Sequence, residues 1–277
     1  MLKISPSRVS QIIASLEKQM GSELFDRTTR SVELTKLGTM VYQEVRPLLD
    51  RWNDMESRLD ALRRTDQNEL RLAMVSSSAY TLFPDLLRAV RMAKSSVSIN
   101  PVSCAFSGEV ERLLETAQCD IGIVRYTHKK QALRYSPILQ DPLCIAVPRS
   151  MGLVDGNNWR QLITRFPLLM YPKDIGSAIT DQIKAMLGAE SVQPKNQIQV
   201  SNTLTMHSMI AAGRGVAFVP SSSAAFQVPG VKCVAINQAP TTTLGLAWSA
   251  HWATTKVPQL IEEIAPLLAS FSQTRAR

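Results

Sequence analysis

Apolar residues recur at helical spacing in the first twenty residues of the chain. They follow one another at three- and four-residue steps, as one face of a helix requires: Val9, Ile12, Ile13, Leu16 and Met20. Ser5 suits the N-cap, because its hydroxyl can accept a hydrogen bond from a free N–H of the first turn, and Pro6 suits the next position. Gly21 suits the C-cap. The pattern predicts a short, capped helix over residues 6–20.

A second, longer helical pattern follows two short extended runs. Residues 24–34 place these runs around a polar, basic tip, which predicts a β-hairpin wing. Thr35 can cap a helix that continues to about Arg64, with a kink expected at Pro47. Its apolar positions alternate four- and three-residue steps: Val41, Val45, Leu48, Trp52, Met55, Leu59 and Leu62. This heptad spacing is typical of a coiled coil and indicates a dimerisation helix.

After a polar hinge at residues 65–69, strand and helix patterns alternate to the end of the chain. Strands are expected at 70–76, 97–106, 121–124, 143–148, 168–171, 198–200, 215–220 and 242–248. Helices are expected to begin near Leu82 and to cover 108–117, 178–187, 204–212 and 258–271. Alternation of this kind predicts parallel sheets with helices on both faces, and the length favours two small α/β lobes.

Composition places the chain among ordinary globular proteins. Of its 277 residues 45% are hydrophobic and 19% are charged. Apolar runs are too short for a membrane span, and Met1–Arg8 does not resemble a signal peptide, so we expect a cytoplasmic protein with no membrane partner.

Cysteine and histidine spacing gives no sign of a metal or a cofactor. The four cysteines (Cys104, Cys119, Cys144 and Cys233) lack paired spacing and are expected to be reduced thiols, and the three histidines lie far apart. Sequence motifs of hydrolases, phosphate-binding loops and zinc proteases do not occur either, so no catalytic residue is assigned and the protein is not expected to be an enzyme.

The net charge of +8 is unevenly distributed. Residues 1–69 contain 11 basic and 11 acidic residues, so the whole excess lies in residues 70–277. It therefore says little about DNA binding and leaves two interpretations open: an anionic ligand, or a solvated basic surface.

The N-terminal motif resembles that of LysR-type transcriptional regulators. The matching residues occur in the family's order and spacing: Ser5-Pro6-Ser7-Arg8-Val9-Ser10-Gln11, Leu16-Glu17, Gly21, Leu24-Phe25-Asp26-Arg27, Arg30, Leu34-Thr35 and Gly38. Looser similarity continues at 119–123, 141–143, 169–172 and 211–220.

The resemblance implies the fold class: α/β, with a partial winged helix-turn-helix and a long linker helix, then a two-lobed effector domain like the periplasmic binding proteins. The expected boundaries are 1–38 for the DNA-binding domain, 39–66 for the linker and dimerisation helix, and 67–277 for the effector domain. Lobe I is expected at about 70–147 and 246–277, and lobe II at about 148–245.

One departure from the family concerns the segment before Leu2, where members carry a further helix and part of a second. That helix packs behind the recognition helix in the family's docking mode. Two explanations are open: a start codon placed too late, or a member deficient in DNA binding.

In the family docking mode, the predicted helix 6–20 lies in the major groove. Arg8 can pair with guanine and Gln11 with adenine, and Ser7 lies beside them. Ser5 and Pro6 place the helix N-terminus at a phosphate, and Arg30 at the wing tip approaches the backbone or the minor groove. The plainer alternative is that these arginines are solvated charges. Arg27 is equally suited to pairing with a carboxylate.

The resemblance also places an effector between the lobes. Hydroxyl-rich positions where strands meet helices are candidates, together with one cation: Ser77, Ser78, Ser107, Tyr171, Asn202, Thr203 and Arg125. Each hydroxyl alone could simply be an N-cap. Together with the basic excess, they favour a carboxylate effector.

The sequence therefore predicts a ligand-responsive regulator that binds double-stranded DNA as a homodimer or homotetramer. The alternative is a truncated ligand-binding or interaction protein that dimerises without productive DNA binding.

Overall fold

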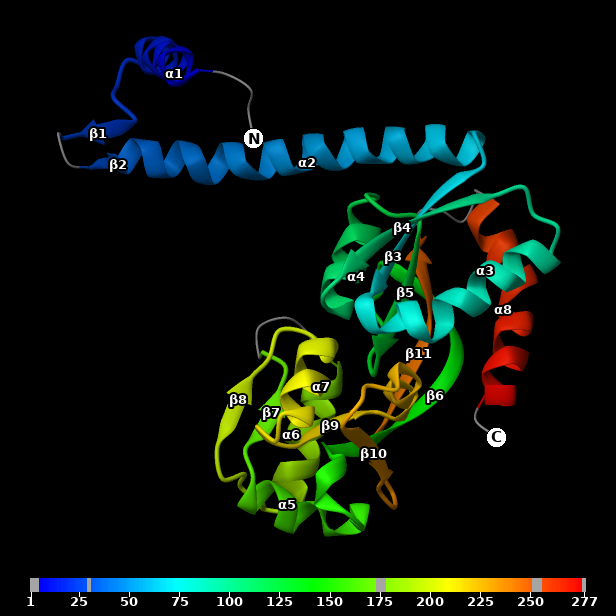
Figure 1. The fold of residues 1–277 in the computed structure, drawn as a ribbon. Helices are drawn as coiled ribbons and strands as arrows, with labels where there is room; N and C mark the ends of the chain where they lie inside the picture. Colours follow the sequence, from blue (N-terminus) through cyan, green and yellow to red (C-terminus); the bar gives the residue numbers. More distant parts are fainter. Residues whose placement is uncertain (1–4, 29–30, 173–177, 251–255, 276–277) are drawn as a thin grey trace. The chain divides into compact units, whose positions relative to one another are not determined.

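The computed structural model describes residues 5–28, 31–172, 178–250 and 256–275. The chain forms two compact units, Met1–Glu56 and Ser57–Arg277, which are considered separately (Figure 1). The boundary between them falls within one long helix, so the helix belongs to both units.

The first unit opens with helix α1 (Pro6–Met20), which begins and ends at the predicted residues. The Ser5 hydroxyl accepts a hydrogen bond from the Arg8 amide at 3.4 Å, and Pro6 fills the first helical position. Gly21 adopts a left-handed conformation with φ of 68° and donates its N–H to the Glu17 carbonyl. Both caps thus satisfy backbone groups that a helix end would otherwise leave free.

A two-stranded antiparallel hairpin follows, formed by β1 (Phe25–Arg27) and β2 (Val32–Leu34), which confirms the predicted wing. The next helix, α2 (Lys36–Asp66), is capped by the Thr35 hydroxyl, which accepts from the Gly38 amide at 2.9 Å. A Cβ at Gly38 would lie 2.0 Å from the Leu24 carbonyl oxygen. Only glycine therefore lets the hairpin and α2 approach this closely.

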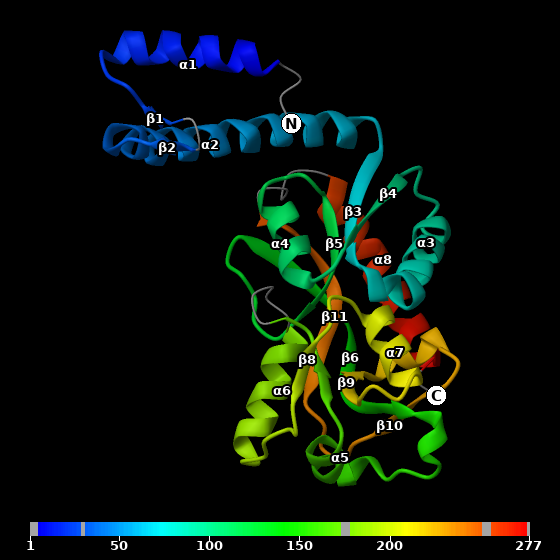
Figure 2. The same ribbon diagram turned by 60° about the vertical axis from the view of Figure 1, so that its left-hand side comes forward.

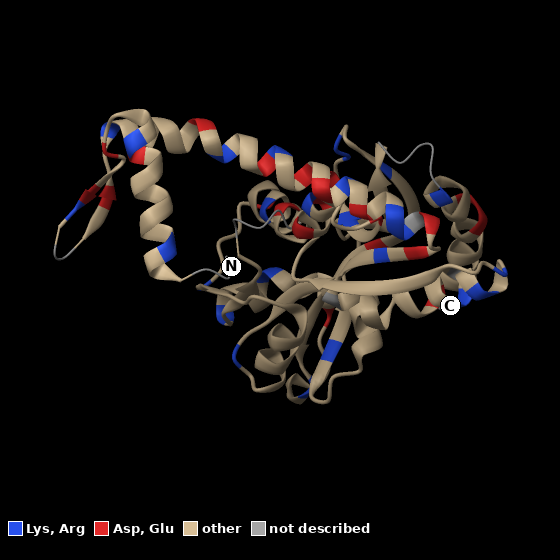
Figure 3. Ribbon diagram, turned by 90° about the horizontal axis from the view of Figure 1, so that it is seen from above, with Lys and Arg blue, Asp and Glu red and all other residues tan. Residues whose placement is uncertain are grey.

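Helix α2 runs without interruption through Pro47, and most of its surface is exposed. Basic and acidic residues alternate along it (Figure 3), and pairs such as Arg46–Asp50 and Arg63–Asp60 lie one turn apart. Its last turns belong to the second unit. There Ala61 is fully buried, and Arg64 contacts Asp120 at 3.4 Å.

The second unit contains two lobes. Lobe I has the strand order β6-β11-β5-β3-β4, where β3 is Glu69–Val75, β4 Ser98–Cys104, β5 Ile121–Tyr126, β6 Leu133–Pro148 and β11 Thr241–Ser249. Helices α3 (Leu82–Met92) and α8 (Lys256–Arg275) pack on one face of this sheet, and α4 (Ser107–Glu115) covers the other (Figure 2). The apolar side chains of β3 and β5 are buried between these layers.

Lobe II is built on the far half of β6. That half pairs with β9 (Ala217–Pro220) and β10 (Val231–Ala235), while β7 (Leu168–Met170) pairs with β8 (Gln197–Gln199). A parallel bridge between Leu168 and Val216 joins the two sets of strands. Helices α5 (Trp159–Arg165) and α6 (Ala178–Ala189) share one apolar cluster, and α7 (Thr203–Ala211) packs into the other.

The expectation of wholly parallel sheets is wrong in part. Strand β3 pairs in parallel with β4 and β5, and β7 with β8. However, β6, β9, β10 and β11 pair antiparallel. Strand β6 is also far longer than predicted, and β10 and α5 were not predicted. The two-lobed α/β architecture itself is confirmed.

Candidate functional site

The N-terminal turn of α1 presents the predicted DNA-contacting residues to solvent. None of the residues of α1 is buried. The hydroxyls of Ser5 and Ser7 lie 3.0 Å apart, beside the open end of the helix and next to Pro6. Within the described part of the chain, the side chains of Arg8 and Gln11 make no hydrogen bond or ion pair, and both line the same shallow hollow on α1. They are thus available to an external acceptor.

The wing contains one arginine whose role the structure clarifies. The guanidinium of Arg27 lies 3.7 Å from the Glu17 carboxylate, which also accepts hydrogen bonds from the Leu24 and Phe25 amides at 2.9 and 3.2 Å. Glu17 therefore fixes the hairpin against α1, and Arg27 supports that carboxylate. Arg30 lies outside the described residues.

The predicted coiled-coil seam of α2 is exposed along its length. Trp52 is 57% exposed, and five further seam residues are exposed to a similar extent: Val45, Leu48, Met55, Leu59 and Leu62. A continuous apolar stripe of this kind, rimmed by charges, is typical of an association surface.

The candidate effector site includes four predicted residues from lobe I. Ser77 and Ser78 lie in the 3₁₀ turn η1 (Ser76–Tyr80), directly after β3, and Ser78 is only 1% exposed. No hydrogen-bond partner is found for the Ser78 hydroxyl within the described residues. Ser107 begins α4, and its hydroxyl accepts from the Arg125 amide at 2.9 Å.

Three predicted residues of lobe II gather at the N-terminus of α7. The hydroxyls of Tyr171 and Thr203 are hydrogen-bonded at 2.7 Å, and Asn202 caps α7 by accepting from the Thr205 amide. The Tyr171 ring meets the Phe106 ring edge-on, with centroids 5.9 Å apart. Because Phe106 immediately precedes Ser107, this contact places the start of α4 in lobe I next to Tyr171 of lobe II.

Arg125 is fully engaged within the protein. Its guanidinium, 6% exposed, donates to Asp141 at 2.7 Å and to the Thr242 hydroxyl at 2.6 Å. Asp141 also accepts from the Ser221 hydroxyl at 2.8 Å and from the Ser222 amide at 3.0 Å. We call these five residues the Asp141 hub; it joins β5, β6 and β11 to the 3₁₀ turn η5 (Ser221–Phe226) of lobe II.

The electrostatics of the hub favour the ionised carboxylate. Burial opposes ionisation of Asp141, but Arg125 and the hydrogen bonds from Ser222 and Ser221 outweigh it and lower the pKa of Asp141 below its ordinary value. Arg125 is therefore neutralised by Asp141. An anionic effector would have to compete with Asp141 for the guanidinium to which the sequence assigned the role of counter-ion.

Sequence reasoning missed the contacts that Asp141, Ser221, Ser222 and Thr242 make in the hub. Asp141 lies inside a strand and is 1% exposed. A lone carboxylate next to an apolar run is the one local signal that could have revealed it, since buried charges are nearly always paired. A cavity of about 580 Å³ lies beside the hub, between α3, α8, β6 and η5.

Among the described residues, no group of three or more His, Cys, Asp or Glu side chains could hold a metal ion. In the same residues, no helix combines the length and hydrophobicity that a membrane crossing needs.

Comparison with known proteins gives a consistent result over both units. Residues 63–269 match the LysR substrate binding domain, and residues 1–39 match the bacterial regulatory helix-turn-helix protein, lysR family. The HTH-type transcriptional regulator IlvR of Caulobacter vibrioides is 29% identical over 251 residues, covering 89% of this chain and 84% of IlvR. The uncharacterized HTH-type transcriptional regulator YnfL of Escherichia coli is 26% identical over 253 residues, covering 90% and 85%.

Solved structures show the same fold. The crystal structure of CbnR, a LysR family transcriptional regulator, superposes with a TM-score of 0.60 at 19% identity and covers 94% of this chain and 91% of CbnR. Full-length CbnR complexed with its target DNA gives the same TM-score at 20% identity, covering 96% and 91%. The chain belongs to the LysR family of bacterial transcriptional regulators.

Proposed function

We propose that α1 reads base edges through Arg8 and Gln11, and that a small carboxylate bound between the lobes controls this contact. Ser5, Pro6 and Ser7 place the helix N-terminus at a phosphate, and Arg30 contacts the DNA backbone from the wing. The protein acts in the cytoplasm, where its DNA target lies, and carries out no catalysis. Pairing along the α2 seam supplies the second recognition helix of a dimer.

The observation that carries the DNA-binding proposal is that the side chains of Arg8 and Gln11, near the N-terminus of α1, are exposed and unpaired among the described residues. The N-cap of this helix is formed internally by Ser5, while Arg8 and Gln11 extend from an exposed surface. A helix N-terminus favours phosphate, and arginine and glutamine each offer paired contacts to a base edge.

Replacing Arg8 with alanine is expected to weaken binding of the selected duplex by about 1–3 kcal/mol, or roughly 5- to 150-fold, because a bidentate base contact is lost. The duplex is first selected from a random pool by the full chain, and binding is then measured by fluorescence anisotropy at fixed salt. Lys18→Ala, at the other end of α1, is the matched control, with only a small loss expected. Equal losses in the two variants would contradict base reading by Arg8.

A second candidate function, a dimeric sensor without productive DNA binding, is favoured by a different observation. The apolar face of α1 is exposed, with Ile12 at 50% and Leu16 at 41%. In a folded protein such a stripe normally has a covering partner. Selection of no duplex from the pool, together with a stable dimer in solution, would decide for this candidate.

The effector proposal is supported by polar residues at the strand-to-helix junctions of both lobes. Ser78 is buried and its hydroxyl lacks a partner among the described residues, and Ser77 precedes it in the same turn. Ser107, Thr203 and the cap residue Asn202 lie at the N-termini of α4 and α7, where backbone N–H groups favour an anion. Hydroxyl and amide donors suit a carboxylate, whereas Arg125 could contact it only by giving up part of its pairing with Asp141.

Replacing Ser78 with alanine is expected to weaken carboxylate binding by about 1.5–3 kcal/mol, roughly 10- to 150-fold, because a hydrogen bond to a charged group is lost. Isothermal titration calorimetry with a panel that includes benzoate and succinate measures this. Ser208→Ala, an exposed serine of α7 that donates to the Leu204 carbonyl, is the control. If the wild-type protein binds a carboxylate and Ser78→Ala binds it equally well, Ser78 does not contact the effector.

A further inference from the structure

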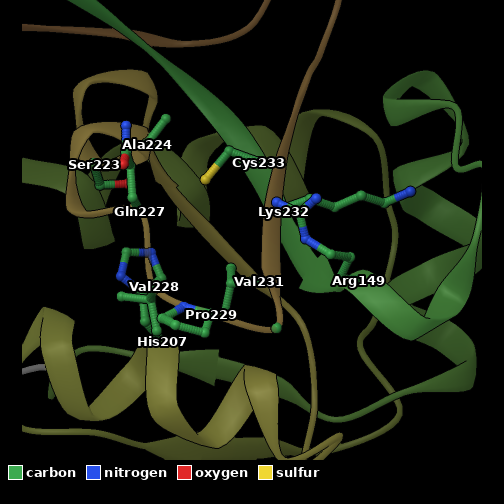
Figure 4. Close-up of a pocket in the computed structure, with 11 residues that line it drawn as sticks. Arg149, His207, Ser223, Ala224, Gln227, Val228, Pro229, Val231, Lys232 and Cys233 are labelled. Atoms are coloured by element: carbon green, nitrogen blue, oxygen red, sulfur yellow. The ribbon is translucent and has the colours of Figure 1, made fainter.

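Lobe II contains a second cavity, of about 750 Å³, which the proposed effector site does not use. It lies between α7, η5 and β10. Its polar and reactive lining residues are His207, Ser223, Gln227, Cys233, Arg149 and Lys232. Figure 4 shows His207, Ser223, Gln227 and Cys233 gathered on one side, while Lys232 extends away on the other. The Lys232 ammonium donates to the Gly152 carbonyl and is thereby occupied.

Two cysteines from neighbouring strands meet at this wall. In the antiparallel pairing of β6 and β10, Cys144 lies opposite Ala235 and Cys233 lies opposite Ala146. The two cysteines are therefore two positions apart in register and share one face of the sheet. Each cysteine therefore shifts the pKa of the other.

The imidazole of His207 is the unusual group of this cavity. The residue is 1% exposed, and neither ring nitrogen has a hydrogen-bond partner among the described residues. Its ring packs edge-on against Phe226, with centroids 5.4 Å apart. A buried polar group without a partner destabilises the folded state. A buried histidine without a hydrogen-bond partner at a cavity wall points to a ligand or a reacting molecule that would bind to its ring nitrogens.

The surroundings of Cys233 favour its thiolate. The neighbouring Cys144 thiol lowers the pKa of Cys233 most, and its effect outweighs burial, which acts in the opposite direction; His207 and Ser223 lower the pKa further. The same pairing and burial raise the pKa of Cys144, with Asp141 adding to the effect. Of the two cysteines, Cys233 is thus the one whose surroundings favour the thiolate, which is the nucleophilic form of cysteine.

We propose that Cys233 is a covalent modification site for small α,β-unsaturated carbonyl compounds, with His207 as the proton donor. The Cys233 proton first passes to His207, which leaves a thiolate. The Cys233 sulfur then bonds to the β-carbon of the compound, the C=C π bond breaks, and its electron pair moves onto the carbonyl oxygen as an enolate. His207 returns the proton to the α-carbon. The product is a saturated thioether, and no oxidant or other reactant is consumed.

The cavity matches such compounds in other respects. Its volume admits a small organic molecule, and apolar walls come from Ala224, Val228 and Val231. Arg149, which forms no ion pair among the described residues, supplies a cation for the carbonyl oxygen. The site also adjoins the cavity beside the Asp141 hub, because Ala224 of η5 lines both cavities and Ser222 of the same turn binds Asp141.

Competitive alkylation of the folded full-length chain with N-ethylmaleimide at pH 7 tests the site. Trypsin separates the four cysteines into the peptides 95–112, 113–125, 135–149 and 233–256, so mass spectrometry follows each rate individually. We expect Cys233 to react at least about tenfold faster than Cys104 and Cys119, whose pKa burial raises to about 11 and about 12. In guanidinium chloride the four rates should converge, which attributes the selectivity to the fold.

Two further arms test the chemistry. His207→Gln, checked for folding by circular dichroism, should slow the Cys233 reaction and move the midpoint of its pH–rate profile upward toward the ~8.5 of a free thiol. 2-Cyclohexen-1-one should add its full mass to Cys233, whereas cyclohexanone, which lacks the C=C bond, should add nothing. Equal rates for all four cysteines, or an unchanged profile in His207→Gln, would overturn the proposal. These readouts involve neither DNA nor a carboxylate, so their failure is separate from that of the proposed function.

Discussion

Replacing Asp141 with asparagine is expected to lower the free energy of unfolding by about 3–5 kcal/mol, because it leaves the buried Arg125 guanidinium without its counter-charge. Arg125 and Asp141 are 6% and 1% exposed, and their atoms lie 2.7 Å apart. The asparagine retains the size of the side chain and some of its hydrogen bonds. The expected loss therefore comes from the charge rather than from a void.

Urea unfolding followed by circular dichroism measures this loss. Asp60→Asn, in the exposed pair with Arg63, is the matched control, for which at most about 1 kcal/mol is expected. The double variant Arg125→Met with Asp141→Leu should regain much of the stability lost in Asp141→Asn, since it removes both buried charges. A loss from Asp141→Asn no larger than that of the control would show that the hub contributes little.

The same carboxylate gives the stability a predictable pH dependence. Because the pKa of Asp141 is lowered in the folded protein, the unfolded chain takes up its proton first as the pH falls. The contribution of Asp141 is therefore complete above about pH 5, and it is lost as the pH falls below ~3.9 toward the folded-state pKa. Asp141→Asn should reduce the slope of the unfolding free energy against pH in this range.

The second large effect is expected on the dimer. Introducing glutamates at Trp52 and Leu59 places two charges on the α2 seam, where apolar side chains of a paired helix would otherwise be buried. With about 2 kcal/mol or more from each position, the dissociation constant should rise by roughly a thousandfold. Sedimentation velocity over a range of concentrations should then show a monomer.

Arg51→Gln with Arg58→Gln supplies the control, since these residues lie on the same turns of α2 outside the predicted seam. This control should remain a dimer. A dimer that persists in Trp52→Glu with Leu59→Glu would mean that the seam is not the association surface, and the exposure of its apolar residues would need another partner.

Local signals in the sequence were enough to predict where the helices of the first unit begin and where α1 ends. The caps Ser5, Gly21 and Thr35 act through atoms within a few residues, and the structure contains each of them. The antiparallel pairing of β6 and β11 was not foreseeable in this way. Residues 133–142 do not alternate regularly between buried and exposed positions, and they contain Pro137. The two-residue alternation that would predict a strand is therefore missing. Its conformation is set by its neighbour β11, about a hundred residues later.

The residues around the candidate effector site also differ in whether local or long-range contacts determine their positions. Ser78 and Thr203 could be placed at strand-to-helix junctions from the sequence because such a junction is a local pattern. The Asp141 hub could not be placed in this way, because Arg125 meets Thr242 only after the chain has completed lobe II. Long-range hydrogen bonds of this type depend on strand register, which a single sequence does not contain.

The route of β6 and β11 has a consequence for synthesis of the protein. Lobe II is a continuous insertion between them, so all of its strands and helices leave the ribosome before β11 and α8, which complete lobe I. Until β11 arrives, β5 and β6 each present an unpaired edge where that strand will lie. A chain that stops after lobe II keeps both edges open, and an open edge is a template for aggregation. The nascent protein therefore depends on β11 and α8 to close these edges, although all of lobe II has already been synthesised.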